Sequence, residues 1–189
     1  MKALVILGSP RKGGNTDILA EQVVAGMIDG GTEVEIIRLA DYKINPCLAC
    51  GGCEKTGQCV VQDDMQELYP RIDSADRLIL VSPIYFYGVT AQLKAFIDRC
   101  QAQWSRKYLL RQRRQGRVPR IGYFVSAAAT KGEKIFDGAA LTVQYALDAM
   151  DFKYGGALLV KGVDLKGAVR EKPEELDRAR QFGRKIAET

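Results

Sequence analysis

The residues best suited to chemistry are cysteines, because four of the five in the chain lie within thirteen residues. They follow the spacing C-x2-C-x2-C-x5-C and are Cys47, Cys50, Cys53 and Cys59. Short gaps rich in glycine and alanine allow a loop to wrap several thiolates around one small object. Three thiolates at a ferredoxin-like interval, with a fourth nearby, match a [4Fe-4S] cluster best. We therefore predict that these four cysteines are cluster ligands.

Two other uses of this loop stay open. Zinc is the second choice, because structural zinc sites usually place two C-x2-C pairs on separate knuckles. A loop that keeps its thiols free, or that has lost its cluster, is the other alternative. Disulfides fit poorly, because the cysteines are too close in sequence to close useful loops. The remaining cysteine, Cys100, falls on a predicted helix and is expected to pack in the core.

A second candidate for chemistry is the glycine-rich stretch Gly8-Ser-Pro-Arg-Lys-Gly-Gly-Asn-Thr16, which follows an apolar run and precedes an amphipathic one. A buried strand, a glycine-rich turn and a helix start together form an anion site, because unpaired N–H groups and the helix dipole converge there. The spacing fits neither the dinucleotide fingerprint nor the nucleoside-triphosphate loop. Hydroxyl, amide and guanidinium groups suit a terminal phosphomonoester, and they come from Ser9, Arg11, Asn15 and Thr16. Helix capping and chain turning are the alternative reading.

The third candidate is the segment Ser82-Pro83-Ile84-Tyr85-Phe86-Tyr87-Gly88, which follows the apolar run Arg77–Val81. Three successive aromatic residues at the end of a central strand are unusual for a loop that faces solvent, although any single ring could belong to the core. Together they favour a wall for a flat aromatic ligand. The small residues from Ser126 to Thr130 could approach the same ligand through their backbone.

Five predicted strands alternate with five predicted helices, which indicates a doubly wound parallel α/β sheet. We expect the strands at 3–7, 33–39, 77–81, 118–125 and 157–160, and the helices from 17, from 63, and at 90–104, 136–150 and 173–188. In parallel sheets of this kind, ligands bind at the point where the strand order reverses. With the flavodoxin-like order 2-1-3-4-5, this point lies between strands one and three. Those strands end in the phosphate loop and the aromatic segment. A phosphate cradle beside an aromatic wall points to FMN.

Composition sets the remaining bounds. With 189 residues, 47% of them hydrophobic, and no linker, we expect one domain over 1–189 with a cysteine-rich loop at 45–60. The apolar runs are shorter than a membrane span and no cleavage signal is evident, so we expect a cytoplasmic protein without a membrane partner. The chain has no histidine. This excludes most hydrolytic triads and histidine-based zinc sites.

The net charge of +5 is concentrated in one run. Seven basic residues with no acidic residue among them leave a net charge of about −2 for the rest of the chain, and they are Arg106, Lys107, Arg111, Arg113, Arg114, Arg117 and Arg120. A solvated loop or subunit contact is the favoured interpretation. A site for the extra phosphate of NADPH is second. Nucleic-acid binding is not expected, because no recognition motif accompanies the charge.

The motifs together resemble one known family. They are the phosphate loop, the cysteine loop followed by Asp63-Asp64-Met65, Ser82-Pro83-Ile84-Tyr85-Phe86, and Lys94-Ala95-Phe96-Ile97-Asp98-Arg99. This combination covers most of residues 1–160. It is similar to the NADPH-dependent FMN reductase superfamily, specifically its iron-sulfur flavoprotein branch.

The resemblance implies an FMN-dependent oxidoreductase that assembles as a homodimer or homotetramer. It implies FMN phosphate binding by the first loop, flavin contacts from the second, and a [4Fe-4S] cluster on the four cysteines. The implied cofactor-binding residues are Ser9, Arg11, Asn15, Thr16, Pro83, Ile84, Tyr85, Phe86, Gly88 and Ser126. No catalytic side chain is predicted, because the flavin carries the chemistry.

Two main classes of function stay open. In the first, an enzyme passes electrons from NAD(P)H through FMN and the cluster to flavin, quinone or another small acceptor. In the second, an electron-transfer protein shuttles between a ferredoxin-like donor and a partner, and the basic run docks an acidic surface. A third and more distant reading is a thiol or zinc module without FMN.

Overall fold

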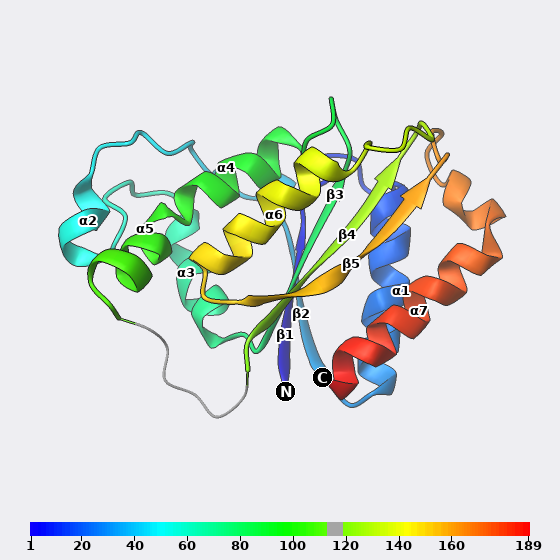
Figure 1. Ribbon diagram of the computed structural model, residues 1–189, viewed down its shortest axis with the longest axis horizontal. Helices are drawn as coiled ribbons and strands as arrows, with labels where there is room; N and C mark the ends of the chain where they lie inside the picture. The colour runs from blue at the N-terminus through cyan, green and yellow to red at the C-terminus, as the bar shows by residue number, and fades with distance from the viewer. Residues whose placement is uncertain (113–118) are drawn as a thin grey trace.

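Five strands form one parallel sheet in the computed structural model, which describes residues 1–112 and 119–189. The strand order β2-β1-β3-β4-β5 confirms the predicted doubly wound topology (Figure 1). The strands are β1 (Lys2–Leu7), β2 (Glu33–Arg38), β3 (Arg77–Pro83), β4 (Ile121–Ala128) and β5 (Lys153–Lys161).

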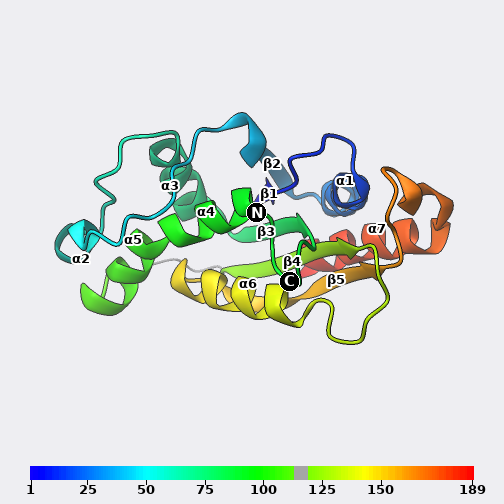
Figure 2. The same ribbon diagram turned by 90° about the horizontal axis from the view of Figure 1, so that it is seen from above.

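Helices cover both faces of the sheet (Figures 1 and 2). One face carries α1 (Asn15–Asp29) and α7 (Pro173–Glu188). The other face carries α3 (Met65–Ser74), α4 (Ala91–Arg99), α5 (Gln101–Trp104) and α6 (Asp137–Ala149). The short helix α2 (Gly52–Thr56) lies in the cysteine loop, and single turns occupy Leu39–Asp41, Ser105–Leu109 and Ala168–Glu171. Among the described residues, no helix is both long enough and apolar enough to cross a bilayer.

The central strands are buried on both faces, as a parallel sheet between two helix layers requires. Along β1, Leu4 and Ile6 enter the core under α3, α4 and α6, whereas Val5 and Leu7 enter the core under α1 and α7. This alternation follows from the two-residue repeat of a strand. It explains why the apolar run at the start of the chain has no polar interruption.

The register aligns the ends of the three central strands. Leu7 lies opposite Val81, and Val81 lies opposite Val125. The loops that follow β1, β3 and β4 therefore leave the same edge of the sheet side by side. This is the edge at which parallel sheets bind ligands.

Some element boundaries differ from the sequence expectation. The fourth strand was expected at 118–125 but runs from Ile121 to Ala128, because its small C-terminal residues pair in register with β5. Val118 lies outside the described residues. The helix expected at 90–104 is interrupted at Cys100, whose ψ is 1°. The last helix occupies the predicted range.

The helices α1 and α7 touch through their backbones. A Cβ atom on Gly26 would lie 2.0 Å from the carbonyl oxygen of Arg180, and one on Gly183 would lie 2.0 Å from that of Val23. At the same contact Asp29 accepts hydrogen bonds from Arg180 and from Arg184. The close approach fixes α1, and therefore the loop that leads into it.

We expect Gly183→Ala to lower the free energy of unfolding by about 1–3 kcal/mol, because the added methyl group forces the two helices apart. In an uncrowded helix the same change stabilises by roughly 1 kcal/mol. Urea denaturation measures whether the substitution lowers or raises the free energy of unfolding. Gln181→Ala, at an exposed position of the same helix, is the control and should change stability by less than about 0.5 kcal/mol. A stabilised Gly183→Ala variant would contradict the backbone contact.

Candidate functional site

The loop after β1 is fixed at its first residue by both neighbouring elements. The N–H of Gly8 donates to the carbonyl of Val81 at 2.8 Å, and the hydroxyl of Thr90 donates to the carbonyl of Gly8 at 2.6 Å. A Cβ atom on Gly8 would lie 2.8 Å from the Cβ of Leu93. Only glycine therefore allows the loop to start this close to α4.

The second half of the loop is held by a carboxylate in the first turn of α1. Gly13 adopts φ +66°, and its N–H donates to Asp17 at 2.9 Å. Arg38, at the end of β2, pairs with the same carboxylate at 2.8 Å, and the Asp17 side chain is only 3% exposed. The guanidinium offsets a negative charge that would otherwise repel an anion in the loop.

The helix α1 starts without a side-chain cap. Gly14 occupies the cap position and offers no side-chain acceptor. The N–H groups of the first turn therefore lack the usual partner and present the positive end of the helix dipole. A phosphate is a suitable acceptor for such a helix start.

These N–H groups face a cleft of about 110 Å³ between the loop after β1 and the ends of β3 and β4. Its volume suits a phosphate and a few adjoining atoms rather than an entire nucleotide. Seven of the predicted cofactor residues line it, and they are Ser9, Arg11, Asn15, Thr16, Pro83, Ile84 and Tyr85. Ala127 and Ala129, from the predicted small-residue segment, also line it, and the loop after β5 adds two residues that the sequence did not single out, Val163 and Asp164.

Asn15 lines the cleft but uses its side chain elsewhere. Its amide nitrogen donates to the carbonyls of Val163 and Leu165 at 3.2 and 2.9 Å, and its oxygen accepts from the N–H of Val169 at 3.1 Å. The amide thus ties the loop after β5 to the start of α1. Only the backbone of Asn15 is left to contact an anion.

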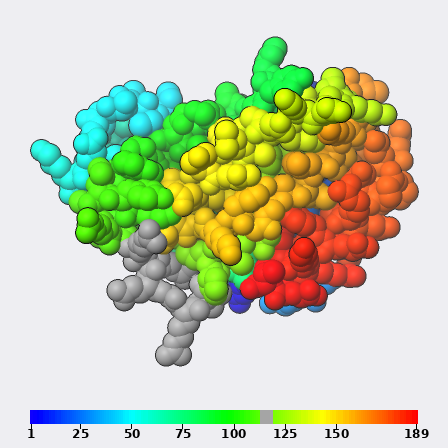
Figure 3. All heavy atoms as spheres, viewed as in Figure 1, coloured from blue at the N-terminus to red at the C-terminus, as the bar shows by residue number. Residues whose placement is uncertain are grey.

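The three other predicted residues lie outside the lining. Ser126 is fully buried within β4, and its hydroxyl donates to the carbonyl of Ser82 at 2.7 Å. Phe86 is 104% exposed and belongs to the turn after β3, which projects at the top of Figure 3. Gly88 closes this turn by exchanging two hydrogen bonds with Tyr85.

The turn after β3 is strained in a way that keeps its rings outward. Phe86 and Tyr87 both adopt left-handed conformations, with φ of 49° and 62°. The left-handed conformation costs a residue with a side chain about 1–2 kcal/mol. Strain of this kind is typical of functional sites.

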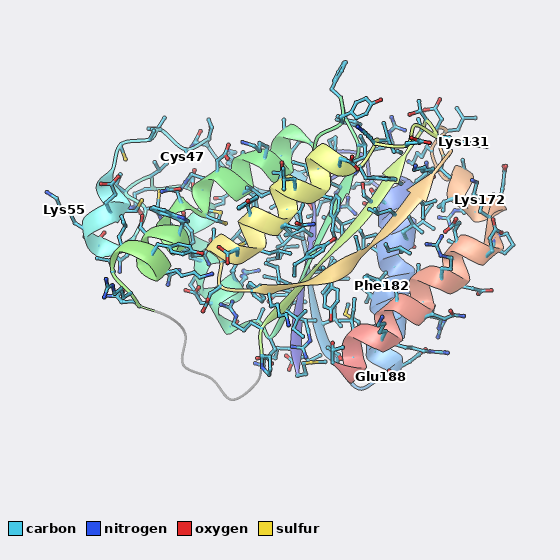
Figure 4. All side chains as sticks on the ribbon, viewed as in Figure 1. Cys47, Lys55, Lys131, Lys172, Phe182 and Glu188 are labelled. Atoms are coloured by element: carbon cyan, nitrogen blue, oxygen red, sulfur yellow. The ribbon has the colours of Figure 1, made fainter. Side chains whose placement is uncertain are left out.

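The four clustered cysteines line a different cavity, an open one of about 360 Å³ at the α2 end of the molecule. Figure 4 shows Cys47 on the loop there, far from Lys131 at the end of β4. Cys50 is exposed and the other three are partly exposed. Cys100 is instead buried in the core, and burial raises the pKa of its thiol well above the ordinary value.

Within the described residues, no three acidic or thiol side chains converge closely enough to hold one metal ion. A single zinc ion needs every sulfur about 2.3 Å from one point. A four-iron cluster binds each thiolate at a different iron and holds the thiolates farther apart. The four thiols thus line one open cavity without converging as ligands of one ion.

A buried arginine closes the cysteine loop. The side chain of Arg99, at the end of α4, is 0% exposed and pairs with Asp63 at 2.6 Å. It also donates to the carbonyls of Asn45 and Val61, which flank the four cysteines. Burial by itself raises the pKa of Asp63, but the hydrogen bonds from Arg99 and from two backbone N–H groups outweigh it, so the pKa lies below its usual value.

The residues of the predicted basic run have separate partners in the structure. Arg106 pairs with Asp73 at 2.7 Å, and Lys107 pairs with Asp148 at 2.8 Å. Arg120 donates to three backbone carbonyls and stacks on an aromatic ring. These three side chains therefore join neighbouring segments of the fold. Arg111 is exposed, and Arg113, Arg114 and Arg117 lie outside the described residues.

Comparison with known proteins decides the family. A profile of the NADPH-dependent FMN reductase family matches residues 1–160. The chain belongs to this family. An iron-sulfur flavoprotein of Archaeoglobus fulgidus is 37% identical over 188 residues, which is 100% of this chain and 80% of that protein. An iron-sulfur flavoprotein of Methanosarcina thermophila is 30% identical over 177 residues, or 94% and 86%.

A solved structure agrees with the fold. The NAD(P)H:quinone oxidoreductase from Methanothermobacter marburgensis superposes with a TM-score of 0.75 over 98% of both chains, at 19% identity. Family membership makes this chain a flavin-dependent oxidoreductase with FMN as the family's cofactor, as the sequence motifs predicted. Family membership argues against the third and more distant reading, a thiol or zinc module without FMN.

Sequence reasoning missed the residues that shape the two sites. Asp17, Arg38 and Thr90 have no signature in the sequence, because their partners are backbone groups or residues far along the chain. Asp63 and Arg99 belong to motifs that support the family resemblance, yet the spacing gave them no role. An acidic residue just after a cysteine loop and an arginine at a helix end were the available signals.

We expect Asp63→Asn to lower the free energy of unfolding by about 3–5 kcal/mol at pH 7, because the charge of Arg99 is left buried without its partner. The folded-state pKa of Asp63 is lowered, so this contribution is complete above the unfolded pKa of about 3.9 and disappears as the pH falls through the folded value. Urea denaturation at a series of pH values from 7 to 3 measures the difference in the free energy of unfolding between wild type and Asp63→Asn.

Asp41→Asn is the matched control, because the pair of Asp41 with Lys12 is exposed. It should change stability by less than about 1 kcal/mol. A gap between wild type and Asp63→Asn that stays constant down to pH 3 would contradict the role of the ionised carboxylate.

Proposed function

We propose that the cleft beside α1 binds the phosphate of FMN and that the turn after β3 supports the flavin ring. The supporting observation is that the two segments singled out for phosphate and ring meet in one cleft at the carboxyl edge of the sheet. Ser9, Arg11 and the N–H groups of the first turn of α1, including that of Thr16, would bind the phosphate. Asn15 would contribute through its backbone.

The flavin ring would extend from the cleft across the surface of the turn. Pro83, Ile84 and Tyr85 line the cleft, and Phe86 is fully exposed just beyond them. Gly88 allows the turn to close, and Ser126 supports it from beneath through its bond to Ser82. The small size of the cleft agrees with a ring that lies outside it.

NAD(P)H is the proposed electron donor. FMN, when bound, supplies the capacity to take up a hydride and to release electrons singly or in pairs. The protein then has to bind, orient and shield, and it needs no side-chain base. The chain has no histidine that could serve as such a base. The acceptor would be quinone, free flavin or another small molecule.

We propose further that Cys47, Cys50, Cys53 and Cys59 hold a [4Fe-4S] cluster. Support comes from the four thiols around one open cavity and from the names of the two relatives that match along most of their length. A ferredoxin-like protein is the proposed partner for electrons that enter or leave at this end of the molecule.

A homodimer or homotetramer is the proposed assembly. Three neighbouring rings of the turn after β3 are each at least 44% exposed, namely Tyr85, Phe86 and Tyr87. Exposed aromatic groups of this kind are typical of interface cores. A second copy would cover them and the outer side of the flavin.

We expect Arg11→Gln to weaken FMN binding about 10- to 100-fold, because a charge-assisted hydrogen bond contributes roughly 1.5–3 kcal/mol. Titration of the apoprotein with FMN, followed by quenching of flavin fluorescence, gives the dissociation constant. Lys12→Gln is the matched control, because Lys12 pairs with Asp41 outside the cleft. Equal losses in the two variants would contradict a specific phosphate contact.

We expect anaerobically purified wild type to contain about one FMN, four iron and four sulfide per chain. The variant Cys53→Ser should lose iron and sulfide, keep FMN, and still show anaerobic bleaching of flavin by NAD(P)H. Cys100→Ala, which changes the cysteine outside the loop, should keep the iron. Wild type with flavin but no iron after reconstitution would overturn the cluster and leave the reductase proposal intact.

A further inference from the structure

We propose that Arg99 is the positioning residue of the cysteine site, which clamps both ends of the loop and donates a hydrogen bond to a sulfur ligand there. The inference rests on the proposed cluster. It adds a residue that is not a ligand and that controls both the order of the loop and the reduction potential of what the loop binds.

The clamp follows from the reach of one side chain. Nη1 of Arg99 donates to the carbonyl of Asn45 at 3.0 Å, and Nη2 donates to that of Val61 at 3.2 Å. Asn45 comes two residues before the first cysteine and Val61 two residues after the last. A single planar guanidinium therefore joins the two ends of the segment that carries all four thiols. Lysine, with one nitrogen, lacks this fork.

Asp63 orients the guanidinium from the other side. It pairs with Nη1 at 2.6 Å and accepts hydrogen bonds from the N–H groups of Asn45 and Met65. Both carboxylate and guanidinium are removed from solvent, at 5% and 0% exposure. If the arginine rotated away, an unpaired charge would be left buried. The orientation of its other N–H groups is therefore fixed as well.

One of the donors left over is the Nε–H group. It is buried and has no hydrogen-bond acceptor among the described residues. Unsatisfied buried donors are rare and unfavourable in folded proteins. Arg99 lines the same cavity as the four cysteines. A sulfur atom in this cavity is the acceptor that would satisfy the group.

Cys59 is the proposed acceptor, because it lines this cavity together with Arg99 and also lines a neighbouring cavity together with Tyr69. The Tyr69 hydroxyl donates to the carbonyl of Arg99 and also lies against Cys59. The fourth cysteine is thus flanked by two groups that the fold holds in place.

The charge of Arg99 sets the direction in which the reduction potential of the proposed cluster is shifted. A hydrogen bond or positive charge beside the sulfur ligands stabilises the more negative, reduced form and raises the reduction potential. Removing the guanidinium should lower the potential. Removing the carboxylate of Asp63 should raise it, because the charge of Arg99 is then no longer neutralised.

The test compares Arg99→Gln and Asp63→Asn after anaerobic reconstitution, with the reduction potential of the cluster followed by electron paramagnetic resonance. We expect the potential to fall in the first variant and to rise in the second. Lys55→Gln is the control, because Lys55 lies exposed at the outer end of the loop (Figure 4) and changes charge without touching the clamp. Shifts of the same sign in both variants would overturn the electrostatic role.

Hydrogen exchange of segment 45–61 in the cluster-free protein tests the clamp separately. We expect exchange to be at least tenfold faster in Arg99→Gln and in Arg99→Lys, and unchanged in Lys55→Gln. Arg99→Lys keeps the charge and is the fallback if Arg99→Gln does not fold. Unchanged exchange in Arg99→Lys overturns the clamp. Wild type without iron overturns the proposed cluster and the redox role together, whereas the exchange result still decides the clamp.

Discussion

The buried ion pair between Arg99 and Asp63 is the interaction on which the cysteine loop depends. It lies at the C-terminal end of α4, and the N-terminal end of the same helix is anchored by Thr90, which bonds the first residue of the phosphate loop. One helix therefore holds both candidate sites, one at each end.

The two candidate sites handle negative charge in a similar way. The phosphate cleft relies on an uncapped helix start and on Arg38, which neutralises the one carboxylate that shapes the loop. The cysteine cavity relies on a buried guanidinium whose charge is only partly offset by its carboxylate partner. In both cases an acidic side chain performs the shaping, and an arginine from another element prevents it from repelling the ligand.

The turn after β3 is the part of the proposed flavin site that is most exposed in the single chain. Its residues accept left-handed backbone conformations, and the result is an aromatic ring held away from its own core. Such a ring is unfavourable in water unless a flavin or another subunit covers it. A turn that supports a ligand at an interface between two copies of the chain would explain both the left-handed backbone conformations and the exposed ring.

Strand and helix periodicities and short motifs are local properties, so they were enough to predict the doubly wound fold and the places of the glycine-rich loop, the aromatic turn and the cysteine loop. The sequence also placed α7 at its observed bounds through Pro173 and the charged ends. Only the tertiary structure showed that the side chain of Asn15 is a tie to the loop after β5, that Ser126 is buried in a strand, and that Arg99 joins the ends of the cysteine loop. These roles depend on partners up to 154 residues away, and hydrogen bonds between such partners exist only after the sheet has brought them together.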